Sequence, residues 1–366
     1  MSGQPSKPRL RDLGITIGTM PTGPLNAITD VPGVRVGHTT VIAGEGATAA
    51  RTGVTAIHPH EGSAFTSPVP AAIAILNGAG EITGRSEVDE FGTLGSPILI
   101  TSTHYVGAVH RAVIDWLAIH EPGLGPWFVI PVVAETYDGF LNDAVTLHVT
   151  REHVFAAIDG ASGGPVAEGN VGGGTGMTLF NFKGGVGTSS RRVTIGEQTY
   201  TIGVEVQGNF GSRANLLVDG VPVGLEITDL MPERGTPGEG SIIVVIGTDA
   251  PLSDRQLARL CRRGMLGLGR VGSTAGNSSG DLLLAFSNTP GNRVPRGGEN
   301  MLLSSVRLAD EHMNDVFQAT VEATAEAVLN AMVAAETMVG KNGNVVHALP
   351  HDRLREIMRK YGRLRE

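Results

Sequence analysis

The sequence predicts a mixed α/β or α+β protein in which helices cover the faces of sheets. Short β-prone segments come in groups near the start, strands and helices then alternate, and the C-terminal end is mainly helical. That order is typical of layered folds that combine the two element types. No internal repeat with a period of about 20 to 50 residues is visible, which argues against solenoids and propellers.

The N-terminal part predicts short strands, then a strand, a helix and a further strand. Turn signals such as PTGP and DVPGV separate β-prone pieces in residues 14–54. Apolar runs predict strands within 71–84 and over 127–136. Between them, residues 97–123 open as a strand and become a helix that ends at a Pro-Gly pair. The polar turn YDGFLND follows the strand predicted at 127–136, and active sites often lie at such strand ends.

The C-terminal part begins with the most glycine-dense stretch of the chain, over residues 160–190. We interpret it as a hairpin region inside one domain, because two segments of alternating apolar and polar residues follow it. Further along, a helix begins after Ser253, which suits the N-cap position, and a strand spans 281–288. The Ala-rich stretch 310–338 predicts a long helix, and a basic helix ends the chain.

Composition excludes several classes of function. The 366 residues could form one large or two to three ordinary domains, and 41% hydrophobic with 17% charged residues indicates a compact globular protein. The 52 glycines indicate many tight turns and close backbone approaches. A net charge of −8 disfavours nonspecific binding to nucleic acid or to anionic membranes, so we expect neither as a partner.

A single cysteine, Cys261, excludes an internal disulfide and any Cys-rich zinc site. It shares a helical pattern with Leu257, Leu260 and Leu268, so we predict that it is buried by packing. The start, MSGQPSKPRLRDLGI, lacks the apolar segment of a signal peptide, and no apolar run is long enough to span a membrane. These observations favour a cytoplasmic location.

Three common kinds of site fit the sequence poorly. The glycines of GNVGGGTGM lack the flanking strand, helix and acidic residue of a dinucleotide site, and no Gly-Lys-Ser/Thr follows them. The pairs His58 with His60 and His104 with His110 have no HExxH pattern or cysteine cluster, so we expect no metal. No GxSxG motif places a serine between a strand and a helix.

The junction GTPGEGSIIVVI raises a different possibility, because Ser241 follows Gly240 directly before an apolar strand. A serine hydroxyl needs a base, and an N-terminal residue can use its own α-amine, whose pKa of about 7.7 to 8.0 suits neutral pH. An internal serine gains that amine if its hydroxyl attacks the preceding carbonyl and water hydrolyses the resulting ester. Locally the same residues also fit an ordinary turn before a strand.

Several motifs together distinguish these alternatives. The segments RLRDLGI, TGPLNAITDVPGVRVGHTT, AETYDGFLND, GNVGGGTGM, QGNFGSR and GEGSIIVVIGTDAPLSDRQLARL resemble the DmpA/BapA family of aminopeptidases. That family comprises L-aminopeptidase/D-amidase/D-esterase enzymes and β-peptidyl aminopeptidases. The resemblance spans most of the chain and implies a single domain, residues 1–366, folded as a four-layer αββα sandwich (the DOM fold, shared with ornithine acetyltransferases). It also implies self-cleavage into two chains that stay together.

Carried over to this sequence, the resemblance implies cleavage between Gly240 and Ser241, which would give chains 1–240 and 241–366. Ser241 would then be the nucleophile. Ser279 and Asp281, in SSGD, would orient its α-amine and share the proton, since a carboxylate stabilises an ammonium group.

Three further residues complete the expected site. The resemblance gives Asn209 and Tyr137 as groups that stabilise the oxyanion, a role for which an amide N–H and a phenol are suited. Glu135 lies two residues before Tyr137 on the predicted strand, so we expect it on the same face, where it could bind the free ammonium of a substrate.

The sequence therefore predicts a self-processing serine aminopeptidase, amidase or esterase that acts on short peptides, amides or esters through an acyl-enzyme and needs no cofactor. The resemblance also suggests a homo-oligomer, such as a tetramer, of processed pairs. Two alternatives are an acyltransferase of the ornithine acetyltransferase type and a noncatalytic binding protein on the same fold. The preference for L-, D- or β-amino acids is left open by the motifs.

Overall fold

The structure is a computed structural model of the whole chain, and it describes residues 7–233, 240–297 and 301–365. Residues 1–6 lie outside this description, and so do residues 234–239, which make up most of the predicted glycine-proline loop. Gly240 and Ser241 lie within it, so the geometry of the predicted cleavage site can be followed.

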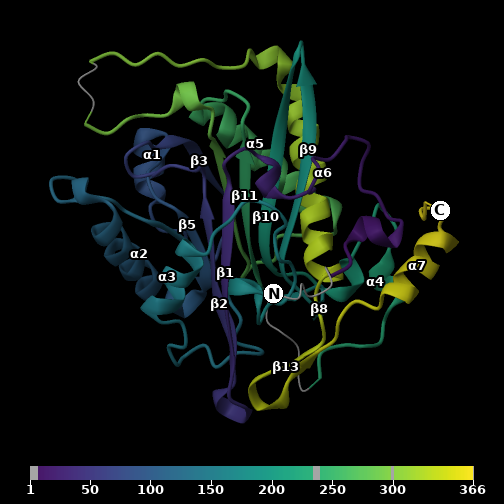
Figure 1. Cartoon of the computed structure of the whole chain (residues 1–366). Helices are drawn as coiled ribbons and strands as arrows, with labels where there is room; N and C mark the ends of the chain where they lie inside the picture. The colour runs from purple at the N-terminus through teal and green to yellow at the C-terminus, as the bar shows by residue number, and fades with distance from the viewer. Residues whose placement is uncertain (1–6, 234–239, 298–300, 366) are drawn as a thin grey trace.

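Two sheets form the centre of the molecule (Figure 1). The smaller sheet has the strand order β1-β2-β5-β6, and only β5 and β6 run parallel. The larger sheet has the order β4-β3-β12-β11-β10-β9, and only β11 and β12 run parallel. Its strands are β3 (Val69–Gly78), β4 (Thr93–Leu94), β9 (Gly185–Ile195), β10 (Gln198–Asn209), β11 (Ser241–Thr248) and β12 (Gly280–Ser287); those of the smaller sheet are β1 (Arg35–Ala43), β2 (Ala50–His58), β5 (Ile98–Ser102) and β6 (Val132–Thr136).

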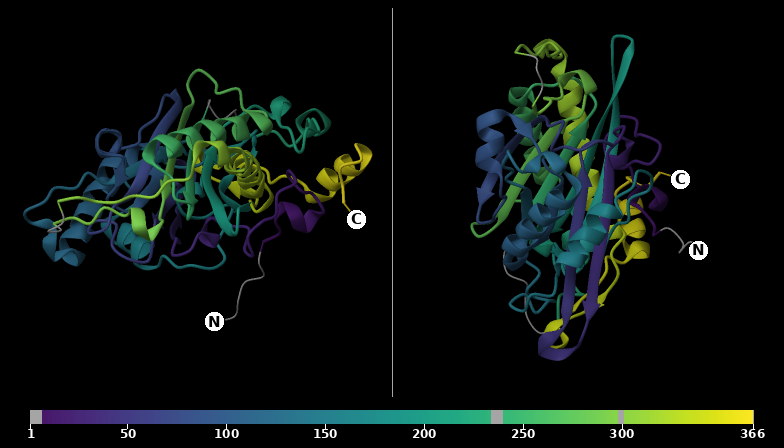
Figure 2. Two further views of the ribbon diagram at one scale, coloured as in Figure 1. Left: turned by 90° about the horizontal axis from the view of Figure 1, so that it is seen from above. Right: turned by 60° about the vertical axis from the view of Figure 1, so that its left-hand side comes forward.

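Helices cover the outer face of each sheet, which confirms the predicted αββα sandwich. Apolar residues on one face of the smaller sheet pack against α2 (Val106–His120) and α3 (Arg151–Asp159). The outer face of the larger sheet packs against α5 (Asp254–Arg270) and α6 (Met313–Val333). A third apolar cluster lies between the sheets, and Figures 1 and 2 show the two helix pairs on opposite sides of the strands.

The remaining elements are short. Two small hairpins pair β7 with β8 and β13 with β14. Their bounds, with those of the other helices, are β7 (Thr178–Leu179), β8 (Phe182–Lys183), β13 (Met338–Val339), β14 (Val345–Val346), α1 (Arg85–Phe91), α4 (Val223–Glu226) and α7 (His351–Lys360). In the described part of the chain, no helix is long and apolar enough to cross a membrane.

Local sequence signals are confirmed in several elements. Ser253 caps α5, where its hydroxyl accepts a hydrogen bond from the backbone N–H of Gln256 at 3.4 Å. Cys261 is fully buried against the larger sheet, as its helical pattern predicts. The glycines of GNVGGGTGM form a buried turn of 3₁₀ helix at Gly172–Gly174, which agrees with the tight-turn interpretation.

Two predicted elements are longer than the structure shows. The strand predicted over 127–136 begins only at Val132, because Trp127 and Phe128 belong to a surface loop and are 48% and 64% exposed. The helix predicted over 310–338 begins at Met313 and ends at Val333. It ends there because Asn170 pairs with the backbone of Glu336 through both its amide oxygen and its amide nitrogen, which turns the chain away.

Candidate active site

Ser241 is the first residue of β11, at one end of the larger sheet. It is in register with Asn209, the last residue of β10, and with Gly280, the first residue of β12. Ile243 and Val245 alternate with it and pack between the two sheets, so the Ser241 side chain faces the smaller sheet. The serine is buried, with 4% of its surface exposed.

Gly240 fits its position only because it has no side chain. A Cβ atom there would overlap the carbonyl oxygen of Asn209. The Gly240 carbonyl accepts a hydrogen bond from the backbone N–H of Gly280 at 3.2 Å. The bond between Gly240 and Ser241 is therefore held by the two strands that flank β11, and its carbonyl already has an N–H donor.

Tyr137 reaches Ser241 from the opposite sheet. Its backbone N–H donates to Ser241 Oγ at 3.3 Å, and its carbonyl accepts from Asn209 Nδ2 at 2.8 Å. The tyrosine side chain is 48% exposed, and its ring meets that of His104 edge-on at 5.8 Å. The structure therefore places the Tyr137 backbone at the serine, while the Tyr137 ring contacts His104.

Ser279 and Asp281 flank Gly280, the residue opposite Ser241 in β12. Ser279 Oγ donates to Asp281 Oδ1 at 2.7 Å, while Asp281 Oδ2 is buried without a hydrogen-bond partner among the described residues. Burial raises the pKa of Asp281, although the Ser279 hydrogen bond acts in the opposite direction. Neighbouring strands lie about 4.8 Å apart, so this pair is close to the Ser241 backbone.

Glu135 lies inside β6 and is 2% exposed. Its carboxylate accepts hydrogen bonds from the backbone N–H of Glu81, at 2.9 Å, and from the Thr103 hydroxyl. Burial raises its pKa, against the effect of these two hydrogen bonds. Because β6 ends at Thr136, strand alternation does not extend to Tyr137, and it cannot be used to place Glu135 and Tyr137 on one face.

Three of the four histidines that could suggest a metal, His58, His60 and His104, contact backbone carbonyls. Ring nitrogens of His58 and His60 contact the carbonyls of Ile158 and Ser67, at 3.1 Å and 3.0 Å. Burial lowers the pKa of His58 to about 4, so it is uncharged at neutral pH. Across residues 7–233, 240–297 and 301–365, no group of three or more His, Cys, Asp or Glu is arranged to hold a metal ion.

Two groups in the site were not predicted from the sequence. The first is the Gly280 N–H, whose role depends on strand pairing between residues forty positions apart. The second is Thr178, whose N–H and hydroxyl both donate to Asn209 Oδ1, at 2.7 Å and 3.2 Å. Thr178 follows GNVGGGTGM directly, and that proximity is the only local signal for it.

The chain is similar to known aminopeptidases along most of its length. Peptidase family S58 matches residues 26–346. The beta-peptidyl aminopeptidases BapA of Sphingosinicella xenopeptidilytica and Sphingosinicella microcystinivorans are 49% and 47% identical, covering 96% and 98% of this chain and 91% and 93% of theirs. The structure of the L-aminopeptidase D-Ala-esterase/amidase from Ochrobactrum anthropi, described as a variant of the Ntn hydrolase fold, matches with a TM-score of 0.93 at 45% identity, covering 98% of this chain and all of that one.

Proposed function

The chain belongs to peptidase family S58 and is an aminopeptidase, and we propose that it cleaves itself before Ser241 to become active. One observation carries this proposal: the Gly240–Ser241 bond lies between Asn209 and Gly280, with the Tyr137 N–H on the serine oxygen. The arrangement supplies a nucleophile at the start of β11, a carbonyl with a donor from β12, and a further donor from the residue that follows β6.

Processing begins with attack of Ser241 Oγ on the Gly240 carbonyl carbon. The C–N bond breaks, an ester forms on Oγ, and the proton from the hydroxyl passes to the departing nitrogen. Water then hydrolyses the ester and leaves a carboxylate on Gly240 and a free amine and hydroxyl on Ser241. The Gly280 N–H, at 3.2 Å from the Gly240 oxygen, is placed to stabilise the negative charge that develops there.

Turnover uses the same serine with its new amine as base. Ser241 Oγ attacks the substrate carbonyl while the α-amine takes the hydroxyl proton and later returns it to the leaving amine. Ser279 and Asp281 would orient the amine, the latter through Oδ2, which has no hydrogen-bond partner among the described residues. Asn209 donates one N–H to the Tyr137 carbonyl, which leaves its second N–H for the oxyanion together with the expected Tyr137 hydroxyl.

The family implies peptide substrates, and the structure supports a proposal for how their N-terminal residue is bound. Glu135 lies close to the site and is a candidate for binding the substrate ammonium, because a carboxylate with two fixed donors is pre-oriented for an ion pair. The two BapA relatives act, by name, on β-peptides, so peptides with an N-terminal β-amino acid are the first substrates to test beside L- and D-amino acid amides.

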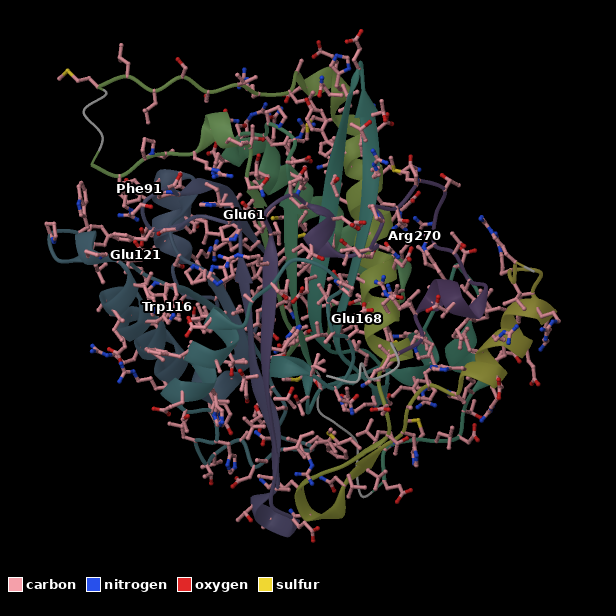
Figure 3. All side chains as sticks on the ribbon, viewed as in Figure 1. Glu61, Phe91, Trp116, Glu121, Glu168 and Arg270 are labelled. Atoms are coloured by element: carbon pink, nitrogen blue, oxygen red, sulfur yellow. The ribbon has the colours of Figure 1, made fainter. Side chains whose placement is uncertain are left out.

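We also propose that the enzyme is a homo-oligomer. The segment between β12 and α6 extends away from the two sheets (Figures 1 and 2) and carries Met301 and Leu302, which are 98% and 90% exposed. In the same segment, Arg296 donates a hydrogen bond to the backbone carbonyl of Phe128, which is 64% exposed. Phe91, 62% exposed, lies on the same side of the molecule (Figure 3). Large exposed apolar groups of this kind mark interfaces, and light scattering would measure the mass in solution.

Substitution of Ser241 tests the proposed function. Ser241→Ala removes the attacking oxygen, so the purified variant is expected to remain one chain and to hydrolyse neither peptides nor amides. Ser212→Ala, at an exposed loop serine, is the control and is expected to be processed and active. Efficient turnover by Ser241→Ala would overturn the assignment of the nucleophile. Added amine acceptors would reveal whether acyl transfer competes with hydrolysis.

A further inference from the structure

Lys183 is a buried lysine that the proposed reaction does not use. Its side chain is fully buried in β8. The side-chain nitrogen donates to the carbonyls of Met177 and Gly184, both at 2.7 Å. Among the residues that the structure describes, no carboxylate lies within ion-pair distance of it. Burying an amine without such a partner costs free energy unless its N–H groups are hydrogen-bonded, and these two hydrogen bonds offset that cost.

The two carbonyls flank the hairpin formed by β7 and β8. Thr178 pairs with Lys183 across this hairpin, and its central residues Phe180 and Asn181 both have positive φ, of 50° and 60°. That conformation is the tight turn in which both central residues are left-handed. The Lys183 amine therefore joins the two ends of the hairpin, at Met177 and Gly184.

Thr178 connects the hairpin to the proposed oxyanion site. Because its N–H and hydroxyl both donate to Asn209 Oδ1, the amide oxygen of Asn209 faces the hairpin. The amide nitrogen then faces the other way, where it donates to the Tyr137 carbonyl. Tyr137 in turn donates its backbone N–H to Ser241 Oγ. Hydrogen bonds joined by the covalent Met177–Thr178 link, the Asn209 side chain and the Tyr137 backbone thus connect the buried lysine to the serine.

We propose that Lys183 is a positioning residue for the oxyanion site, because it fixes the β7–β8 hairpin and, through Thr178, the orientation of the Asn209 amide. This inference rests on the proposed function, in which Asn209 stabilises the oxyanion. Lys183 touches neither Ser241 nor Gly240 in any described contact, and both its bonds are to carbonyls, so its part in the reaction is indirect.

The ionisation of Lys183 agrees with this role. Burial, assisted by the charge of Lys7, lowers the pKa of Lys183 well below its ordinary value. An uncharged amine has two N–H groups, and the carbonyls of Met177 and Gly184 accept both. The contacts therefore do not require a buried positive charge.

Lys183→Met tests the proposal, because methionine has a similar length but no N–H donors. We expect the variant to be processed and to show kcat reduced by about 10- to 100-fold with KM changed less than about twofold, since oxyanion contacts act on the transition state. Affinity for a peptide aldehyde, which forms an oxyanion on the serine, should fall by a similar factor. Affinity for the free amino acid product should stay the same.

The control is Lys360→Met, which removes an exposed lysine paired with Glu226 and should leave all four quantities unchanged. The proposal would be overturned if Lys183→Met kept the wild-type kcat and the wild-type affinity for the aldehyde. It would also be overturned if the affinities for the aldehyde and for the product fell equally, because such a result indicates general disorder of the site. Failure of the proposed function is distinguishable, because then Ser241→Ala would remain active.

Thr178 provides a second route if Lys183→Met does not fold or is not processed. Thr178→Val keeps the N–H but loses the hydroxyl that contacts Asn209, so kcat and aldehyde affinity should fall severalfold together. Thr178→Ser keeps both donors and should restore wild-type values. If Thr178→Val matches Thr178→Ser in kcat and aldehyde affinity, the hairpin does not position the amide and the proposal is wrong.

Discussion

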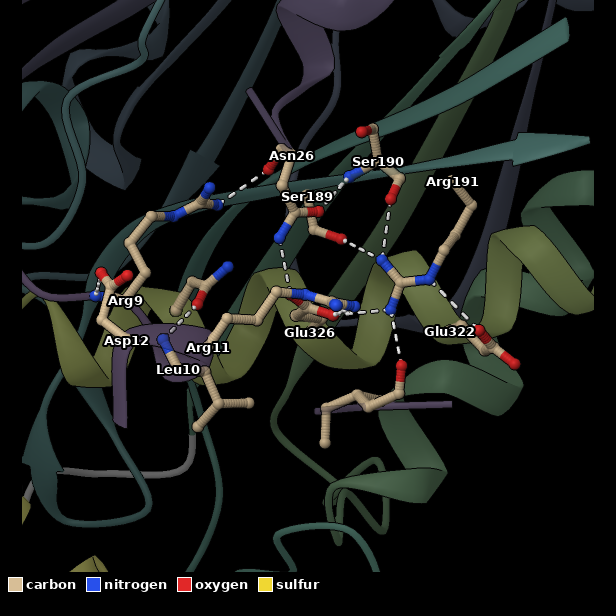
Figure 4. Close-up of polar contacts among 12 residues, drawn as sticks. Arg9, Leu10, Arg11, Asp12, Asn26, Ser189, Ser190, Arg191, Glu322 and Glu326 are labelled. Atoms are coloured by element: carbon tan, nitrogen blue, oxygen red, sulfur yellow. Dashed lines mark hydrogen bonds and ion pairs between the residues drawn. The ribbon is translucent and has the colours of Figure 1, made fainter. Parts of the chain in front are cut away.

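Replacement of Arg191 by methionine should strongly destabilise the protein. Arg191 lies in β9 and is fully buried, and its guanidinium reaches two carboxylates of α6 (Figure 4). It contacts Glu326 Oε2 at 2.6 Å and Glu322 Oε2 at 3.2 Å. Three further bonds go to the carbonyls of Ile17 and Ser190, at 2.7 Å and 2.8 Å, and to the Ser189 hydroxyl, at 3.2 Å.

The magnitude follows from what the substitution leaves behind. Breaking a buried ion pair by removing one partner typically costs about 3–5 kcal/mol. Glu326 would keep its pair with Arg11 at 2.7 Å, and Glu322 would keep backbone N–H donors, but the Ile17 carbonyl would lose the guanidinium. We therefore expect the free energy of unfolding to fall by about 3 kcal/mol or more, out of a typical total of about 5–15 kcal/mol.

Urea unfolding followed by circular dichroism measures this change. Both variants should be made with Ser241→Ala, so that each molecule unfolds as one chain. Arg192→Met is the control, because Arg192 is the adjacent residue and is exposed. A loss below about 1 kcal/mol, or one equal to that of the control, would refute the reasoning, since surface substitutions usually fall within about 0.5 kcal/mol.

Three further predictions concern single residues. Gly240→Ala should abolish processing, because the new Cβ would overlap the Asn209 carbonyl and displace the scissile bond; denaturing electrophoresis should show one chain, and normal cleavage would contradict this. Burial, with the nearby charge of Glu168, raises the pKa of Glu205 to about 8, so the folded protein holds a proton that the unfolded chain releases above 4.5. Stability should therefore fall as the pH rises from 4.5 towards 8, and Glu205→Gln should make this fall smaller in urea unfolding measured across that range, whereas an unchanged pH profile would count against it. Burial raises the pKa of the Cys261 thiol to about 12, so a thiol reagent should label it only after unfolding; rapid labelling of the native enzyme would show that the helix interface opens.

The sequence predicted most elements because their signals are local. The apolar run after Ser241 and the helix after Ser253 carry patterns that packing in this fold reinforces. The errors occurred where a distant partner decides the outcome. The helix ending at Val333 is an example, since its end depends on Asn170, more than 160 residues earlier in the chain. No local pattern reports such a contact.

In the candidate site, too, some residues could be identified from local sequence and others depend on distant contacts. Gly240 and Ser241 stand out locally, whereas Asn209, Ser279 and Asp281 were identified by family resemblance. Strand register places Asn209 and Gly280, the residue between Ser279 and Asp281, beside Ser241. Lys183 and the Gly280 N–H could not be found from sequence. A lysine in a glycine-rich hairpin looks solvent-exposed, and its burial depends on how the hairpin packs.

Intact mass spectrometry of the purified protein under denaturing conditions tests self-processing most directly. Self-cleavage predicts two chains and no covalent link between them, one of which begins at Ser241 and has the mass of residues 241–366. The Ser241→Ala variant should give the mass of the whole chain. A single uncut chain with full aminopeptidase activity would contradict the proposal that the enzyme creates its own N-terminal nucleophile.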